Sequence, residues 1–302
     1  MSRSARRAAA GLLALCLASA VTAARCDEGA ARQLMVGGQE RGYLLHRPPA
    51  LRRDAPAPLV IMLHGGFGSA AQAQKSYGWN ATADRAGFVV AYPEGMGHSW
   101  NAGGMCCGPA LKRGIDDVGF IDRLIREVSA AENIDPRRVY LTGMSNGAAM
   151  SYRYACEGSV PLAAIGPVAG TLSFACPRMH AVSVLAIHGL DDRNVPFAGG
   201  AGTKGVTPGA WQPVPLTLDL LRTADACGPA AVLVEGPLET DSAACAQGRD
   251  LVLIKIAGAG HQWPGSTRKG LLQHVLGGDA PSTALDATAR LWEFFRAHPA
   301  PP

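Results

Sequence analysis

The stretch VYLTGMSNGAAMSYRYA, residues 139–155, decides how this chain is organised. Residues 139–142 form a short apolar run that predicts a buried strand, and residues 148–155 predict a helical segment. Between them lies Gly143-Met144-Ser145-Asn146-Gly147, a G-x-S-x-G sequence. A strand that turns directly into a helix strains the serine backbone and brings neighbouring chains close together, which glycine tolerates best. The pattern therefore predicts a hydroxyl held at the end of a sheet, with a helix N-terminus beneath it.

Short apolar runs elsewhere in the chain predict further buried strands. They lie at residues 59–63, 88–92, 163–168, 182–187 and 251–256. Ahead of them, residues 33–47 predict two short antiparallel strands around Gly37-Gly38, at the edge of a sheet.

Helical patterns separate these runs. Residues 117–131 place apolar side chains at every third or fourth position, which is the helical period. Residues 284–298 predict a last helix, which Ser282 or Thr283 would cap. Because strands and helices alternate, we expect an α/β fold with a mostly parallel central sheet covered by helices on both faces.

The composition predicts a single folded domain over residues 25–302. Of the 302 residues, 48% are hydrophobic and 17% are charged, which supports a substantial core and excludes low-complexity disorder over most of the length. The sequence shows no internal repeat and no clear linker. The Gly- and Pro-rich residues 198–215 are too few to separate two domains, and they predict a surface loop beside the site.

The first 24 residues have the pattern of a secretory signal peptide. Residues 1–7 are basic, residues 8–17 are apolar, and residues 18–24 are rich in small side chains. The apolar part is short for a spanning helix, which needs about 20 residues. A buried N-terminal helix and a lipoprotein signal at Cys16 are the alternatives, and the bulky Leu15 disfavours the second. We expect cleavage between residues 20 and 24 and a protein secreted to the periplasm or the medium, with no membrane contact afterwards.

The charge distribution excludes the nucleic-acid-binding class. The formal net charge is +4, and Arg3, Arg6 and Arg7 lie in the predicted leader, so the mature balance is close to neutral. No run rich in Lys and Arg occurs elsewhere, whereas such a patch is what a nucleic-acid surface requires.

Seven cysteines remain once Cys16 is assigned to the leader. The chain has no C-x-x-C pair and no Cys/His spacing of the zinc type, so we expect no metal site. An exported chain favours disulfides, and neighbours in sequence suggest Cys156–Cys176 and Cys227–Cys245. The pairing of Cys26, Cys106 and Cys107 stays open.

A second glycine-rich loop follows the apolar run at residues 59–63. It reads Leu63-His64-Gly65-Gly66-Phe67-Gly68. In hydrolases built around a G-x-S-x-G turn, this loop and the residue after the nucleophile donate backbone N–H groups to a developing oxyanion. The expected donors are Gly66, or Phe67 in its place, and Asn146. We expect His64 to bond its own loop rather than to act as a base.

Acid and base candidates follow two later strands. Residues 182–187 are followed by His188-Gly189-Leu190-Asp191-Asp192, and residues 251–256 are followed by a Gly-rich loop that carries His261. A serine nucleophile needs an imidazole to take its proton, and the imidazole needs a carboxylate to hold its tautomer. The order Ser145, then Asp, then His261 is the order expected on an α/β-hydrolase sheet.

Several segments together resemble a secreted esterase family that includes feruloyl esterases, acetylxylan esterases and polyhydroxybutyrate-depolymerase-like proteins, all α/β-hydrolases. The matching segments are LHGG (63–66), YPEG (92–95), SWNAGGMCCG (99–108), DDVGF (116–120), DPRRVYLTGMSNGAAMSYRYAC (135–156), IHGLDDRNVPF (187–197), GAGHQWPG (258–265) and LDATARLWEFF (285–295). The resemblance implies Ser145 as nucleophile, His261 as base and Asp192 as acid, with Asp191 as the fallback for the acid.

The resemblance also implies the chemistry. We expect a serine esterase that needs no cofactor and acts on feruloyl or acetyl esters of plant polysaccharides, with hydroxybutyrate polyesters or oligomers as the alternative. Because the chain stops just after its last helix, without the linker and binding module of depolymerases that attack solid polyester, soluble esters are favoured. Trp100, Asn101 and Trp263 are candidate substrate contacts, since aromatic rings stack on flat groups. Asp116 and Asp117 begin a helix, where we expect them to cap it.

Two other classes compete with this interpretation. A non-catalytic binding protein on a hydrolase scaffold would lack chemistry at Ser145, which labelling by a fluorophosphonate would reveal. An exported peptidase or thioesterase would share the same three residues and differ only in substrate.

Overall fold

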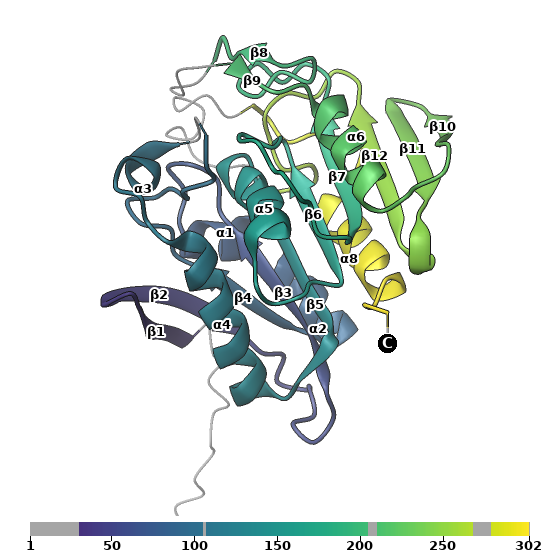
Figure 1. The fold of residues 1–302 in the computed structure, drawn as a ribbon. Coiled ribbons are helices and arrows are strands. Elements are labelled where there is room, and N and C mark those ends of the chain that lie inside the picture. The colour runs from purple at the N-terminus through teal and green to yellow at the C-terminus, as the bar shows by residue number, and fades with distance from the viewer. Residues whose placement is uncertain (1–29, 105–106, 205–209, 268–278, 302) are drawn as a thin grey trace, which may run out of the picture.

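The computed structural model describes residues 30–104, 107–204, 210–267 and 279–301. The predicted signal peptide lies outside these ranges, as do Cys26 and Cys106. Within them the chain forms a ten-stranded sheet with helices on both faces (Figure 1). The predicted α/β architecture is confirmed.

The sheet has the strand order β1-β2-β4-β3-β5-β6-β7-β12-β11-β10. The strand bounds are β1 Ala30–Val36, β2 Gln39–His46, β3 Ala57–Leu63, β4 Val89–Pro93, β5 Ile134–Met144, β6 Ala164–Val168, β7 Ser183–Gly189, β10 Ala231–Glu235, β11 Leu238–Ala244 and β12 Asp250–Ile256. From β4 through β12 the neighbouring strands are parallel, and the pairs at both edges are antiparallel. All strands predicted from the apolar runs and from the edge hairpin are confirmed.

Helices cover the two faces of the sheet in separate layers. Their bounds are α1 Ala70–Ser76, α2 Trp79–Ala86, α3 Gly108–Lys112, α4 Asp117–Glu132, α5 Asn146–Glu157, α6 Val214–Ala224 and α8 Ala287–Ala297. One core lies between the sheet and α4, α5 and α6, and the other lies between the sheet and α1, α2 and α8 (Figure 1). Alternate side chains of β3 enter the two cores, with Leu59 and Ile61 in one and Val60 and Met62 in the other, so the strand is buried on both faces.

Local sequence explains where the longest helix begins and ends. The Asp116 carboxylate accepts a hydrogen bond from the Gly119 N–H at 2.8 Å, so Asp116 caps α4 as predicted. Asn133 ends the helix in the left-handed conformation, with φ of 52°. Asp117, also expected to cap, is instead a fully buried residue of the helix, paired with Arg41.

Three further features differ from the sequence predictions. The last helix is capped by Asp286, which accepts from the Ala289 N–H, and not by Ser282 or Thr283. The predicted loop at residues 198–215 contains a short strand pair, β8 Gly200–Ala201 with β9 Ala210–Trp211, and the start of α6. The hairpin of β10 and β11 was not predicted, although residues 231–234 of β10 are an apolar run like those of the predicted strands; in the structure this run is exposed.

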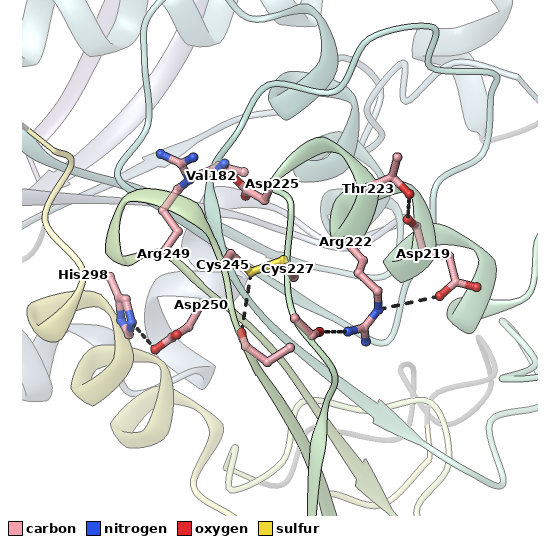
Figure 2. The surroundings of a disulfide bond; sticks show 12 residues. Val182, Asp219, Arg222, Thr223, Asp225, Cys227, Cys245, Arg249, Asp250 and His298 are labelled. Carbon is pink, nitrogen blue, oxygen red and sulfur yellow. Dashed lines mark hydrogen bonds and ion pairs between the residues drawn. A yellow bond between two sulfur atoms is a disulfide. The ribbon is translucent and has the colours of Figure 1, made fainter.

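Two disulfides join the pairs suggested by their spacing, Cys156–Cys176 and Cys227–Cys245. Figure 2 shows the second, which ties the segment after α6 to the end of β11. Beside it the Asp225 carboxylate accepts a hydrogen bond from the Val182 N–H at 2.9 Å and pairs with Arg249. This cluster joins the antiparallel edge of the sheet to the start of β7. It lies beside the first residue of β12, whereas His261 follows the last residue of that strand.

Candidate active site

Ser145 lies between the last residue of β5 and the first residue of α5. Its backbone has φ of 56° and ψ of −116°, a conformation that L residues rarely adopt. The Ser145 N–H donates to the Val168 carbonyl at 2.9 Å, which fixes the turn against the neighbouring strand β6. Such strain is retained where the surrounding structure holds it in place, and it occurs often at functional sites.

The two glycines of the motif are required by close backbone contacts. A Cβ atom on Gly147 would lie 2.6 Å from the carbonyl oxygens of Leu63 and His64. A Cβ atom on Gly143 would lie 2.5 Å from the Gly147 carbonyl carbon. Glycine at both positions therefore lets the start of α5 pack directly on the loop after β3, as the sequence predicts.

His261 and Asp192 meet Ser145 from the ends of two other strands. The His261 Nε2 atom lies 2.8 Å from the Ser145 Oγ atom, and His261 Nδ1 lies 2.7 Å from Asp192 Oδ2. Asp192 follows β7 and His261 follows β12, and these strands are parallel neighbours. Ser145 is 116 positions and Asp192 is 69 positions from His261 in sequence, yet the three side chains form one continuous hydrogen-bonded chain.

The structure distinguishes between the two adjacent aspartates. Asp192 is buried and faces His261, whereas Asp191 is exposed. The second Asp192 oxygen, Oδ1, accepts hydrogen bonds from the Asn194 and Val195 N–H groups at 2.8 and 2.9 Å. Burial by itself raises the pKa of Asp192, but His261 and the Val195 N–H group outweigh it and leave the pKa below its usual value. Asp192 is therefore ionised at neutral pH.

His188 was not identified from the sequence as part of the site. Its Nε2 atom lies 2.8 Å from the Val195 carbonyl oxygen and 3.6 Å from Asp192 Oδ2. Burial lowers the pKa of His188, so the ring is neutral and its Nε2–H donates to the carbonyl. Asp192 therefore lies between two imidazoles. The signal in the sequence was the position of His188 at the end of the same strand.

The loop after β3 lies against Ser145 and Asn146. A Cβ atom on Gly65 would lie 3.6 Å from the Ser145 Cβ atom, and one on Gly66 would lie 3.9 Å from the Asn146 Cβ atom. The Phe67 N–H donates to the His98 carbonyl at 2.9 Å, so this alternative donor is engaged within its own loop. Gly66 is thus the loop residue that is placed beside Asn146.

His64 is wholly buried beneath this loop. The Gly95 N–H donates to His64 Nε2 at 2.9 Å, so this nitrogen accepts and the proton lies on Nδ1, which donates to the Gly65 carbonyl at 2.8 Å. Burial lowers the pKa of His64 to about 4. The His64 ring is therefore neutral and stabilises the loop through these two hydrogen bonds, as expected, rather than acting as a base.

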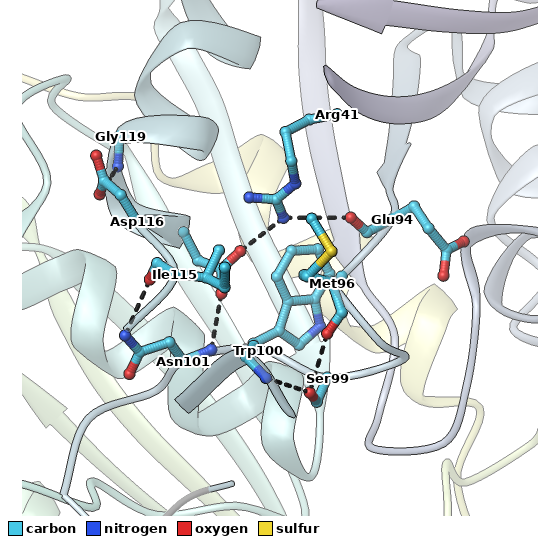
Figure 3. Close-up of polar contacts among 12 residues, drawn as sticks. Arg41, Glu94, Met96, Ser99, Trp100, Asn101, Ile115, Asp116 and Gly119 are labelled. Atoms are coloured by element: carbon cyan, nitrogen blue, oxygen red, sulfur yellow. Dashed lines mark hydrogen bonds and ion pairs between the residues drawn. The ribbon is translucent and has the colours of Figure 1, made fainter. Parts of the chain in front are cut away.

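A buried polar network supports Asn146 from the opposite side. The Trp100 N–H donates to the Asn146 side-chain oxygen at 2.6 Å, and the Asn146 side-chain nitrogen donates to the Trp100 carbonyl at 2.9 Å. The next N–H group, of Asn101, donates to Asp117 at 2.7 Å (Figure 3). Asp117 in turn pairs with Arg41 at 2.6 Å. The Asp117–Arg41 ion pair thus fixes the main chain at residues 100 and 101, and this main chain in turn fixes the Asn146 side chain.

The predicted substrate contacts at Trp100, Asn101 and Trp263 are wrong for this conformation. Trp100 is 0% exposed and packs in the core on the side of α4, α5 and α6, whereas Trp263 is 1% exposed and packs in the core on the other face of the sheet. The Asn101 side-chain nitrogen donates to the Ile115 carbonyl (Figure 3), and its oxygen accepts from the Gly103 N–H. An aromatic residue in a loop looks the same in sequence whether its ring points outward or inward.

Across the described residues, no group of three or more His, Cys, Asp or Glu side chains is arranged to hold a metal ion. In the same part of the chain, no helix combines the length and the apolar character needed to cross a membrane.

Comparison with known sequences finds esterases among the relatives of this chain. The model of the family described as "Esterase PHB depolymerase" matches residues 41–207. The chain is 34% identical over 265 residues to NocK of Nocardia uniformis subsp. tsuyamanensis, an esterase by name, in a match covering 78% of this chain and 74% of that one. It is 31% identical over 170 residues to feruloyl esterase B of Piromyces equi, covering 53% of this chain and 31% of the relative.

Solved structures share the fold at low sequence identity. The acetyl xylan esterase from Aspergillus awamori superposes with a TM-score of 0.60 and 13% identity, over 89% of this chain and all of the other. A thermostable esterase superposes with a TM-score of 0.56 and 18% identity, over 89% of this chain and 62% of the other. These likenesses identify the fold as the α/β-hydrolase fold.

Proposed function

The chain belongs to the family described as "Esterase PHB depolymerase" and is a carboxylic ester hydrolase; from that premise we propose that Ser145, His261 and Asp192 hydrolyse the ester through an acyl-enzyme. The observation that carries the proposal is the hydrogen-bonded chain from Ser145 Oγ through His261 to Asp192, with distances of 2.8 and 2.7 Å. This is the arrangement that a nucleophile, its base and the orienting carboxylate require.

In the first step, Ser145 Oγ attacks the ester carbonyl carbon while its proton passes to His261 Nε2. The ionised Asp192 holds the His261 proton on Nδ1 and stabilises the imidazolium that forms. The backbone N–H groups of Gly66 and Asn146 donate to the oxyanion, and a donor of this kind contributes about 3–4 kcal/mol to transition-state stabilisation. Collapse of the intermediate transfers the proton from His261 to the departing alcohol.

In the second step, water attacks the acyl-serine while His261 takes its proton. The second oxyanion uses the same two amides, and its collapse returns the proton to Ser145 and releases the carboxylic acid. The proposed cycle needs no cofactor, because every proton moves between Ser145, His261, the substrate and water.

The proposed substrates are feruloyl or acetyl esters of plant polysaccharides. Support comes from a relative and a structural neighbour whose names state feruloyl and acetyl xylan esterase activity. The second candidate is a hydroxybutyrate polyester or its oligomers, which the description of the matching family favours. Both are esters of a carboxylic acid, so they use the same chemistry and differ in the groups around it.

We also propose that the protein is exported and acts as one domain over residues 25–302. The leader pattern of residues 1–24 and the two disulfides both fit an oxidising compartment outside the cytoplasm.

The test uses the purified mature chain with methyl ferulate, p-nitrophenyl acetate and a hydroxybutyrate oligomer. We expect turnover of the first two and loss of nearly all activity in Ser145→Ala and in His261→Ala. Cleavage of the hydroxybutyrate oligomer alone would replace the substrate proposal, and full activity in Ser145→Ala would overturn the mechanism.

A further inference from the structure

A single residue outside the proposed triad, Asp279, holds the main chain of His261. The His261 N–H donates to Asp279 Oδ2 at 2.8 Å, and the Asp279 N–H donates back to the His261 carbonyl at 3.0 Å. The carboxylate lies so close to the loop that a Cβ atom on Gly260 would be 2.1 Å from Asp279 Oδ2. Glycine before His261 is therefore the residue that admits this contact.

The other oxygen of the same carboxylate is engaged by a cation. Lys204 Nζ lies 2.6 Å from Asp279 Oδ1, with the two side chains 41% and 24% exposed. The two oxygens are thus divided between the His261 amide and the Lys204 ammonium. Because the aspartate is largely shielded from solvent, this pair is screened less than a fully exposed one.

Lys204 belongs to the segment that also carries Asp192. The Lys204 and Thr203 N–H groups both donate to the Arg193 carbonyl, at 3.0 and 2.8 Å. Arg193 directly follows Asp192, whose carboxylate accepts the next two N–H groups along the chain. The Lys204–Asp279 ion pair therefore connects the segment of the acid to the segment of the base.

We propose that Asp279 and Lys204 form a clamp that positions His261 between Ser145 and Asp192. The proposal rests on the proposed function. The hydrogen bonds between Asp279 and His261 both involve the His261 main chain and not its imidazole, so Asp279 acts as a positioning residue. Catalytic groups must be held to within about 0.5 Å of the productive geometry. A displacement of about 1 Å costs up to 100-fold in rate.

The test measures kcat and KM for p-nitrophenyl acetate in four variants. Asp279→Ala removes the acceptor and the charge, and we expect kcat to fall about 30- to 100-fold with KM within about twofold. Asp279→Asn keeps an acceptor for the His261 amide and loses only the ion pair, as does Lys204→Met, so each is expected to lose about threefold to tenfold. Lys204→Arg keeps the positive charge, and its kcat is expected to equal that of the parent.

The matched control is Asp250→Ala, which removes a carboxylate paired with His298 at 2.8 Å at the opposite end of β12 from His261. It is expected to leave kcat unchanged. The clamp is refuted if Asp279→Ala keeps kcat within twofold of the parent, or if its loss is carried by KM. Should Asp279→Ala not fold, unchanged kcat in Lys204→Met refutes the clamp equally. Activity in Ser145→Ala would instead refute the proposed function, so the two failures are distinguishable.

Discussion

At the scale of single residues, Ser145 and Asp192 show what the sequence can and cannot predict. Ser145 was predictable because its flanking glycines are required by backbone contacts that any strand–turn–helix of this kind makes. The acid was narrowed to two adjacent aspartates, and only the path of the loop after β7 decides which of them faces His261. Asp279 was not predictable, because nothing near it in sequence indicates that it contacts the His261 main chain.

The aspartate pair yields the first prediction. Asp192→Asn replaces the ionised partner of His261 with an amide that can hold the wrong tautomer, so kcat for p-nitrophenyl acetate should fall by about 10³- to 10⁴-fold. Asp191→Asn changes an exposed side chain and should alter kcat by less than about twofold. Comparable losses in the two variants would contradict the assignment.

His64 yields a prediction about pH. Its pKa is about 4 in the folded protein, because it is buried, and about 6.5 when unfolded. Between these values the unfolded chain binds a proton that the folded chain does not, so the free energy of unfolding falls as the pH is lowered. The loss between pH 7 and pH 5 should be about 2 kcal/mol. Urea unfolding at both pH values tests this, and His64→Gln, which cannot titrate, should lack this part of the pH dependence. An equal pH dependence in both proteins would exclude His64 as the cause.

At the scale of elements, the strands were predictable where burial is complete. β3 and β4 are buried along their whole length and appear in the sequence as unbroken apolar runs. β11 is only partly buried and largely polar, so its sequence has no strand pattern, whereas the apolar residues 231–234 of β10 were a signal that the sequence analysis did not use. The short helices α1 and α2 were missed for a related reason, since each contributes few large apolar side chains.

The start of α4 yields a prediction at this scale. Asp117→Asn leaves the charge of Arg41 buried without its carboxylate, so the free energy of unfolding should fall by about 3–5 kcal/mol. Because Asp117 also holds the main chain beside Trp100, which holds Asn146, kcat should fall as well. Chemical denaturation and ester hydrolysis measure the two effects. The double variant Arg41→Leu, Asp117→Asn should recover most of the stability, and a failure to do so would show that the charge is not the cause.

At the scale of the whole molecule, the proposed triad lies at the opposite end of the sheet from the Cys227–Cys245 disulfide and the ion pair beside it. The proposed triad lies at the carboxyl ends of the parallel strands β5, β7 and β12, where such sheets collect their sites. The Cys227–Cys245 disulfide and the Asp225–Arg249 pair lie at the other end of β12 (Figure 2). The mostly parallel sheet, the edge hairpin of β1 and β2 and the position of the proposed site followed from the sequence, whereas the antiparallel hairpin of β10 and β11 did not.

This separation predicts that removing the disulfide affects stability alone. The Cys227→Ser, Cys245→Ser variant opens a loop closed across 18 positions, so it should lose about 3 kcal/mol of unfolding free energy. At 25 °C its kcat should match the parent, because the triad lies at the opposite end of the strand. A large fall in kcat with folding intact would contradict the separation.

The most direct test of the account is covalent labelling with a fluorophosphonate, followed by mass spectrometry of the intact protein and of its peptides. We expect one adduct per chain, located on Ser145, strongly slowed in His261→Ala and absent in Ser145→Ala. An adduct on another residue, or full ester hydrolysis by a chain fully labelled at Ser145, would show that the chemistry occurs elsewhere.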